Sequence, residues 1–427
     1  MEVNGNEKPR SYRIKLIMVL FTCMFIMGLD RSSLGIAAPV IMKELNIDAG
    51  SMGIALSAFF WTYTMFGLPA GSLADKYGAK KVLAWAAAIW SLASAATGVM
   101  GSITGIIASR LGVGVGEAAV FPVTAKIAAD NFPSKERATA VGWYLSGARL
   151  GYAATPIVMG FLIAQYSWRL AFIITGLGSL IWVALWYYWY KEKETVVQEG
   201  SSVTTAEKTP KQKTPWVKLL TNRASLGIFL AKFCGDYLYY MFLTWVPSYL
   251  VMERGFSILK MGFYASLPFL TAFIVQPIMG YVSDWLIKKG FSLTVARKGV
   301  LVAAQLCASS IMIVGFVEDP MIAVAILTLN VAAGSTIGGM MFTLVTEVAP
   351  KGMTATLTGS MNTVGAIAGI LAPTITGFIY KTTGSFQMAL AISGVLLVFA
   401  ACTVLFIIPA IKPIAVQEEQ AEDSATK

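Results

Sequence analysis

Residues 71–81 read GSLADKYGAKK, and residues 280–289 read GYVSDWLIKK. Each stretch begins with a glycine, has an aspartate four residues later, ends on two lysines and follows a long apolar run. Pro39 and Pro247 stand at nearly the same distance before the two stretches. An element repeated once per half indicates an internal duplication, in which each half of the chain folds in a similar way.

The composition excludes an ordinary soluble domain. Of 427 residues, 56% are hydrophobic and only 13% are charged, which leaves too little polar surface to face water. Apolar runs of about 20 residues, the length that crosses a bilayer as a helix, recur along the chain. We therefore predict an all-α integral membrane protein with twelve transmembrane helices in two pseudo-symmetric six-helix bundles.

The chain contains no histidine. A histidine-ligated metal site is therefore excluded, and any proton relay must use carboxylates instead of imidazole. We expect neither a metal nor another cofactor.

The basic residues are distributed unevenly along the chain. The net charge is +10, but most lysines and arginines fall in alternate loops on the side of the N-terminus. This bias predicts a multi-pass protein of the inner (plasma) membrane with both termini cytoplasmic, and it argues against a nucleic-acid partner. The expected organisation is a cytoplasmic N-terminus (1–14), a first six-helix bundle (15–190), a hydrophilic cytoplasmic linker (191–224), a second bundle (225–409) and a cytoplasmic tail (410–427).

Several ionisable residues fall inside the apolar runs. Each costs about 3 kcal/mol at the centre of a membrane and persists where it pairs or serves a pathway. Arg110 and Glu117 are nearly two helical turns apart and share a face, whereas the neighbours Asp30 and Arg31 point about 100° apart. One of these two can therefore face a cavity while the other faces a neighbouring helix.

A charge count at membrane depth leaves a surplus of one positive charge. Lys232 and Asp236, at positions i and i+4, share a face and can neutralise each other. The count sets four cations (Arg31, Arg110, Arg149, Lys232) against three acids (Asp30, Glu117, Asp236). A bound carboxylate would balance this surplus, and protonation of one acid would favour anion binding further.

The duplicated element resembles the signature of the major facilitator superfamily. The resemblance implies that Gly71, Asp75 and Asp284 act in gating rather than in binding. Six further segments resemble the anion:cation symporter family, which includes bacterial galactonate, glucarate and hexuronate transporters and animal sialin. These segments are residues 30–34, 60–63, 110–122, 132–137, 242–247 and 359–362.

The family resemblance implies roles for individual residues. Arg31 matches a substrate-site arginine, and Tyr63 and Asn362 match polar substrate contacts from the two halves. Asp30 and Glu117 match proton-coupling acids, with Arg110 and Asp236 completing the charge network.

The chain also departs from the galactonate branch. Where that branch has a glutamine in the fifth span, this chain has Ala148 and Arg149, and Phe342 replaces a tryptophan. Lys232 resembles the hexuronate branch, and we include it with Arg149 among the substrate-binding residues. If Arg149 faces the cavity, the ligand should carry a second acceptor group. The alternatives are that it pairs with Glu117 or Asp30, or that it snorkels to an interface.

The leading functional hypothesis is proton-coupled uptake of a small organic anion, a sugar acid such as a hexuronate or an aldonate, by a monomer in the lipid bilayer. The nearest alternative is a transporter of an aromatic or other small carboxylate. A non-transporting receptor would leave the intramembrane acids unexplained. An intramembrane enzyme is disfavoured because the chain lacks metalloprotease, serine-hydrolase and P-loop motifs.

Overall fold

The computed structural model describes residues 9–192, 216–350 and 353–414. Within these ranges the secondary structure is helical and contains no strand. Most of the predicted linker and parts of both predicted cytoplasmic ends lie outside the described residues. The helices are α1 (Arg10–Leu45), α2 (Ala49–Tyr77), α3 (Ala79–Thr97), α4 (Ile103–Glu117), α5 (Val120–Asn131), α6 (Ser134–Gln165), α7 (Trp168–Trp189), α8 (Trp216–Thr221), α9 (Arg223–Met252), α10 (Ile258–Lys288), α11 (Leu293–Ser309), η1 (Ser310–Phe316), α12 (Pro320–Val348), α13 (Thr354–Thr383), α14 (Gln387–Cys402) and η2 (Thr403–Ile407).

Short polar side chains define where many of these helices begin. The side chain of Asp48 accepts a hydrogen bond from the backbone N–H of Ser51 at the start of α2, and Asp319 caps α12 in the same way. Ser102 and Ser167 cap α4 and α7. Each cap satisfies at least one of the backbone donors that a helix leaves free at its N-terminus.

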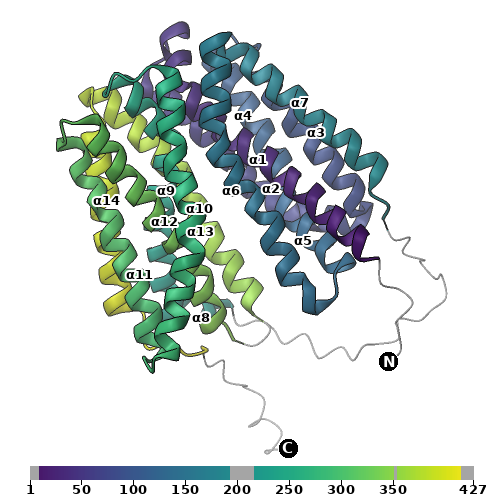
Figure 1. Ribbon diagram of the computed structural model, residues 1–427, viewed down its shortest axis with the longest axis vertical. Helices are drawn as coiled ribbons and strands as arrows, with labels where there is room; N and C mark the ends of the chain where they lie inside the picture. Colours follow the sequence, from purple (N-terminus) through teal and green to yellow (C-terminus); the bar gives the residue numbers. More distant parts are fainter. Residues whose placement is uncertain (1–8, 193–215, 351–352, 415–427) are drawn as a thin grey trace, which may run out of the picture.

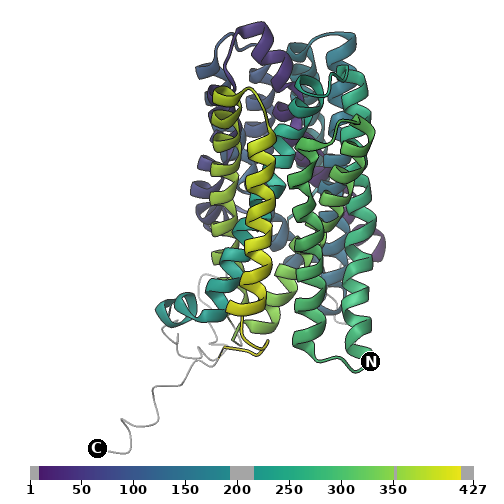
Figure 2. The ribbon, with the colours of Figure 1, turned by 90° about the vertical axis from the view of Figure 1, so that its left-hand side faces the viewer.

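The helices form two bundles that follow the order of the chain (Figure 1). Helices α1 to α7 make up the first bundle and α9 to α14 the second; the first bundle is inclined to the longest axis of the molecule in Figure 1, and the helices of the second bundle follow that axis more closely (Figure 2). The most extensive contacts between the bundles are made by three helix pairs, α1 with α9, α2 with α13, and α6 with α10.

In the part of the chain that the structure describes, ten helices are long and apolar enough to cross a membrane, counting α4 with α5, α11 with η1, and α14 with η2 as single spans. The bent helix α2 is an eleventh if its two limbs form one span. Helix α3 is the remaining long helix, and Lys80 and Lys81 in its first turn lower its mean hydropathy. It packs against α4 and α7 inside the first bundle.

Glycines bring the two bundles into backbone contact at one end of the molecule, where α1 ends and α2 begins. We call this the closed end. A Cβ on Gly35 of α1 would lie 2.8 Å from the carbonyl oxygen of Leu243 on α9, and one on Gly53 of α2 would lie 2.6 Å from that of Pro373 on α13. Gly160 of α6 faces Gly262 of α10, and a Cβ on Gly262 would lie 2.4 Å from the carbonyl oxygen of Pro156 on α6. Only glycine fits such an approach.

Glycines at the opposite end, where α1 begins, meet no such partner. We call this the open end. A Cβ on Gly142 of α6, Gly280 of α10 or Gly359 of α13 would have nothing within 4 Å, and one on Gly71 of α2 would meet only the ring of Pro122, at 3.9 Å. Two of the helix pairs that touch at the closed end, α2 with α13 and α6 with α10, therefore carry glycines without close neighbours at the open end.

Candidate functional site

Four ionisable side chains form a buried cluster in the first bundle. Asp30 and Arg31 lie on α1, and Arg110 and Glu117 lie on α4. The exposed fraction is 1% for Asp30, 2% for Arg110 and 0% for Glu117, and the side chain of Arg31 is 8% exposed. The structure thus brings these four predicted residues together.

Arg31 and Glu117 form an ion pair. The Nε of Arg31 donates a hydrogen bond to Oε2 of Glu117 at 2.9 Å, and its Nη2 lies 2.9 Å from the same oxygen. The other oxygen of Glu117 is buried and has no hydrogen-bond partner among the described residues. A substrate carboxylate that is to bind Arg31 must therefore compete with Glu117.

Asp30 points away from this pair, as the sequence predicted for adjacent residues. Its Oδ1 accepts a hydrogen bond from Oγ of Ser94 on α3 at 2.9 Å, and its Oδ2 is unpaired within the described chain. Two nitrogens of Arg110 are also buried without a described partner. Buried polar atoms without partners are costly, so this region is suited to taking up a proton or a polar group.

Close packing of α4 places Glu117 in the cluster. A Cβ on Gly116 would lie 2.6 Å from the backbone nitrogen of Trp90 on α3, and Gly114 lies against the backbone of Phe59 on α2. Glu117 is the last residue of α4, and the helix is interrupted after it until α5 begins at Val120. The glycines therefore let α4 approach both neighbours and bring its final carboxylate to Arg31.

Aromatic rings separate the charge cluster from the interface between the bundles. The guanidinium carbon of Arg31 lies 4.9 Å from the ring centre of Phe59 and 4.7 Å from that of Tyr63. Next to Phe59, Phe60 packs edge-on against Tyr240 of α9, with ring centres 4.5 Å apart. These rings give Arg31 a cation–π environment and form a wall that the second bundle completes.

A cavity of about 350 Å³ lies between the two bundles beyond this wall. Tyr152 of α6 and Tyr239 and Tyr240 of α9 line it, with ring centres of Tyr152 and Tyr239 6.4 Å apart. Arg149, Lys232, Asp236, Gln276 and Ser335 supply charged and polar groups. The mixture of aromatic surface and a few polar groups is typical of a binding site for a small molecule.

Two predicted residues form the ion pair on the second-bundle side of this cavity. The Nζ of Lys232 donates to Oδ1 of Asp236 at 2.7 Å, and the ring of Phe342 lies 5.6 Å from the same Nζ. The carboxylate of Asp236 lies against the Cα of Gly365 on α13. The pair is therefore held between α9, α12 and a glycine of α13.

Substituting Gly365 with alanine should displace this ion pair. The added methyl group would clash with the carboxylate of Asp236, and overpacking of this kind costs about 1–3 kcal/mol. We expect Gly365→Ala to lower the thermal unfolding midpoint in detergent. Gly359→Ala, on the same helix with nothing within 4 Å, is the matched control. Equal midpoints for the two variants would refute the packing account.

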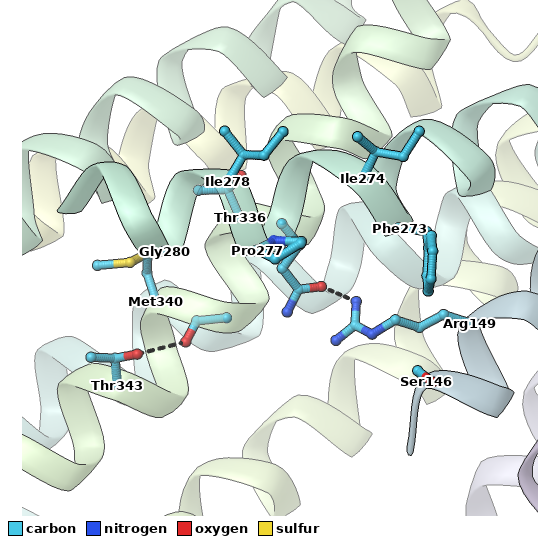
Figure 3. Close-up of a pocket in the computed structure, with 12 residues that line it drawn as sticks. Ser146, Arg149, Phe273, Ile274, Pro277, Ile278, Gly280, Thr336, Met340 and Thr343 are labelled. Atoms are coloured by element: carbon cyan, nitrogen blue, oxygen red, sulfur yellow. Dashed lines mark hydrogen bonds between the residues drawn. The ribbon is translucent and has the colours of Figure 1, made fainter. Parts of the chain in front are cut away.

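Arg149 faces the interface between the bundles. Its Nη1 donates a hydrogen bond to the side-chain oxygen of Gln276 on α10, drawn as a dashed line in Figure 3. Arg149 makes no ion pair with any described residue, so the predicted pairing with Glu117 or Asp30 is wrong. It lines the 350 Å³ cavity and a neighbouring one of about 600 Å³ whose walls include Phe273 and Ile278. The side chain thus reaches across to the other bundle, as expected if Arg149 faces the cavity.

The predicted gating residues lie at the open end. Asp75 pairs with Lys126 of α5 in the first bundle. Asp284 pairs with Arg297 of α11 at 2.6 Å, and Arg297 also pairs with Glu347 of α12 at 3.0 Å. Each of these ion pairs stays within its own bundle in this conformation.

Three predicted substrate contacts, Arg31, Tyr63 and Asn362, are not among the residues that line the cavities. Tyr63 stacks on Phe59, with ring centres 5.3 Å apart, and is part of the aromatic wall that covers Arg31. Asn362 is exposed on α13. Their predicted contacts with substrate stay predictions.

Sequence reasoning missed several residues of the site. Gln276 is an isolated amide in the apolar run that precedes Pro277, and an amide inside a predicted membrane span could have marked it as a site residue. Tyr152 is one helical turn beyond Arg149 and could have been found from that spacing. Ser94 gave no signal, because an isolated serine in an alanine-rich helix is common. In the described ranges, no group of three or more Cys, Asp or Glu residues could hold a metal ion.

Comparisons with known proteins agree with this architecture. The sequence profile of the Major Facilitator Superfamily matches residues 20–373. A bacterial homologue of the human lysosomal transporter Spinster superposes with a TM-score of 0.79 at 16% identity, covering 94% of this chain and 97% of that one. A D-xylose–proton symporter gives a TM-score of 0.75 at 13% identity, covering 95% and 100%. The predicted fold class is confirmed.

Several named proteins are similar in sequence to this chain over nearly its whole length. A probable galactarate/D-glucarate transporter of Bacillus subtilis is 32% identical, covering 97% of this chain and 96% of the relative. A hexuronate transporter of the same organism is 33% identical, covering 95% and 98%. A probable sulfoacetate transporter of Cupriavidus necator is 32% identical, covering 93% and 94%. All three are named as transporters, which confirms the prediction that the chain is not an enzyme.

Proposed function

The chain belongs to the Major Facilitator Superfamily and is a membrane transporter, and from this premise we propose that it carries a sugar acid together with protons. The substrate is a small polyhydroxylated carboxylate that binds in the cavity between the bundles. The single observation that carries the proposal is the buried Arg31–Glu117 pair behind the aromatic wall of that cavity.

The lining of the cavity supports a polyhydroxylated acid. Tyr152, Tyr239, Tyr240 and Ser335 offer hydroxyl groups to substrate hydroxyls, and Arg149 offers a cation to a carboxylate. A cavity of about 350 Å³ suits a small ligand. Similar proteins named for galactarate, glucarate, hexuronate and galactonate point the same way.

The Arg31–Glu117 pair supplies a physical reason for proton coupling. When Glu117 is ionised it occupies Arg31, so the guanidinium is not free for an anion. A proton on Glu117 removes that competition and leaves Arg31 with a positive charge that a substrate carboxylate can balance. Proton uptake and anion uptake therefore strengthen each other, as linkage requires. Asp30, held by Ser94, is the second coupling acid.

The proposal extends to the orientation of the protein in the membrane and to the roles of its two bundles. The open end carries the basic loops, so we place it and both termini in the cytoplasm, with the protein a monomer in the bacterial inner membrane. The two bundles, 15–190 and 225–409, then rock about the cavity, with the segment 191–224 as linker. Uptake proceeds from the closed end to the open end.

Alternating access predicts that the glycines without close neighbours at the open end become buried when the protein closes this end and opens the opposite one. Gly71→Leu should then leave substrate binding in detergent intact but slow transport by about tenfold or more, because the leucine obstructs closure between α2 and α13. Gly178→Leu is the control, since Gly178 also has nothing within 4 Å but lies on α7, which contacts only the first bundle. Wild-type transport by Gly71→Leu would contradict this account.

Uptake assays in proteoliposomes test the substrate class. Labelled D-glucarate and D-glucuronate should accumulate, and an aromatic carboxylate such as benzoate should neither accumulate nor compete. The aromatic wall of the cavity makes benzoate the appropriate competitor. Preferential transport of benzoate would assign the protein to aromatic acids instead.

A further inference from the structure

We infer that Arg149 binds a second acidic group of the substrate, so that the protein prefers a dicarboxylate sugar acid to the matching monocarboxylate. This inference rests on the proposed function and specifies which sugar acids fit the cavity.

The structure locates the surplus positive charge at membrane depth. Lys232 is neutralised by Asp236 at 2.7 Å, and Arg31 by Glu117 at 2.9 Å. Arg110 and Asp30 share the buried cluster, in which two arginines face two carboxylates. In contrast, the partner of Arg149 is the neutral amide of Gln276. The one cation that no described acid balances is therefore exposed to the central cavity.

The guanidinium of Arg149 also has hydrogen-bond donors left for an anion. A guanidinium carries five N–H donors in a planar fork, and the bond to Gln276 uses Nη1. A carboxylate can bind two such donors side by side, and a charge-assisted bond is about twice as strong as one to an amide. Tyr152, one turn further along α6, lines the same cavity and can bind the same end of the substrate.

The two arginines differ in when they become available. Arg149 can accept an acidic group at any time, whereas Arg31 is held by Glu117 until Glu117 takes a proton. With one proton bound, the two positions together carry two uncompensated positive charges. A dianion with an acidic group at each end balances both, and a monoanion leaves one unbalanced.

Galactarate and D-galactonate provide a matched pair for the test, because they differ only in whether one terminal carbon is a carboxylate or a hydroxymethyl group. Binding to the purified protein would be measured for both acids with the parent, Arg149→Gln and Arg149→Lys. The parent should bind galactarate more tightly. Arg149→Gln should weaken galactarate binding by about 10- to 100-fold, the range for a lost hydrogen bond to a charged group, and weaken galactonate binding by a smaller factor, because galactonate can place its single carboxylate on Arg31 once Glu117 is protonated. Arg149→Lys should recover part of the loss.

The other outcomes separate this inference from the proposed function. Equal weakening of both acids by Arg149→Gln, or no weakening of either, would overturn the role of Arg149 and leave sugar-acid transport standing. If the parent binds galactonate but not galactarate, the role of Arg149 is likewise overturned and sugar-acid transport still stands. A parent that binds neither acid would overturn the proposed function as well. Retained galactonate binding by Arg149→Gln also shows that the variant is folded.

Discussion

Replacing Glu117 with glutamine is expected to abolish accumulation driven by a pH gradient while leaving substrate exchange intact. Glutamine resembles the protonated acid in shape and charge, so Arg31 is permanently released for an anion. The variant should therefore bind substrate as well as the parent does at low pH, and its affinity should lose most of its dependence on pH. One coupled proton and a gradient of one pH unit correspond to about 1.4 kcal/mol, or about tenfold accumulation. The variant should reach only equal concentrations on both sides.

The measurement compares two assays on the same proteoliposomes. Exchange of labelled for unlabelled substrate reports binding and reorientation, and uptake after a pH jump reports coupling. Asp30→Asn should lose gradient-driven accumulation in the same way. Undiminished pH-driven uptake in both variants would refute the assignment of these acids.

Replacing Arg31 with lysine is expected to weaken substrate binding by at least about 30-fold, the effect of losing about 2 kcal/mol or more from a buried charge contact. Lysine keeps the positive charge opposite Glu117 but offers a point charge where a carboxylate needs a planar fork. It also removes the stacking of the guanidinium on Phe59 and Tyr63.

The variant must be shown to be folded before the loss is attributed to binding. Arg31→Lys should keep a thermal unfolding midpoint close to that of the parent, because the ion pair with Glu117 can still form. Arg31→Ala would leave the carboxylate of Glu117 without this partner, at a cost of about 3–5 kcal/mol, and is the less informative variant. Parental affinity in Arg31→Lys would show that Arg31 holds the helices together and does not bind substrate.

The sequence was sufficient for the membrane architecture and for most of the charged residues of the site. Hydrophobic runs and a duplicated element report fold class directly, because a bilayer allows few solutions. Spacing along one helix also predicted that Asp30 and Arg31 diverge, and it placed Lys232 and Asp236 on one face, where the structure pairs them.

Contacts between different helices could not be predicted from the spacing of residues along the sequence. Nothing local specifies that Arg31 is held by Glu117 on another helix, or that Arg149 reaches Gln276 in the other bundle. The contact of Gly53 with the backbone at Pro373 likewise depends on how the bundles meet. These features arise from tertiary packing, in which one glycine or one amide decides how closely two helices approach.

Substrate-driven proton movement tests the central claim most directly. Proteoliposomes with a pH-sensitive dye inside and the membrane potential clamped would receive D-glucarate outside, with no pH gradient imposed. The account predicts that the lumen becomes acidic as substrate enters, and that Glu117→Gln carries substrate by exchange without any pH change. Entry of labelled glucarate into parent liposomes with no accompanying acidification would contradict it.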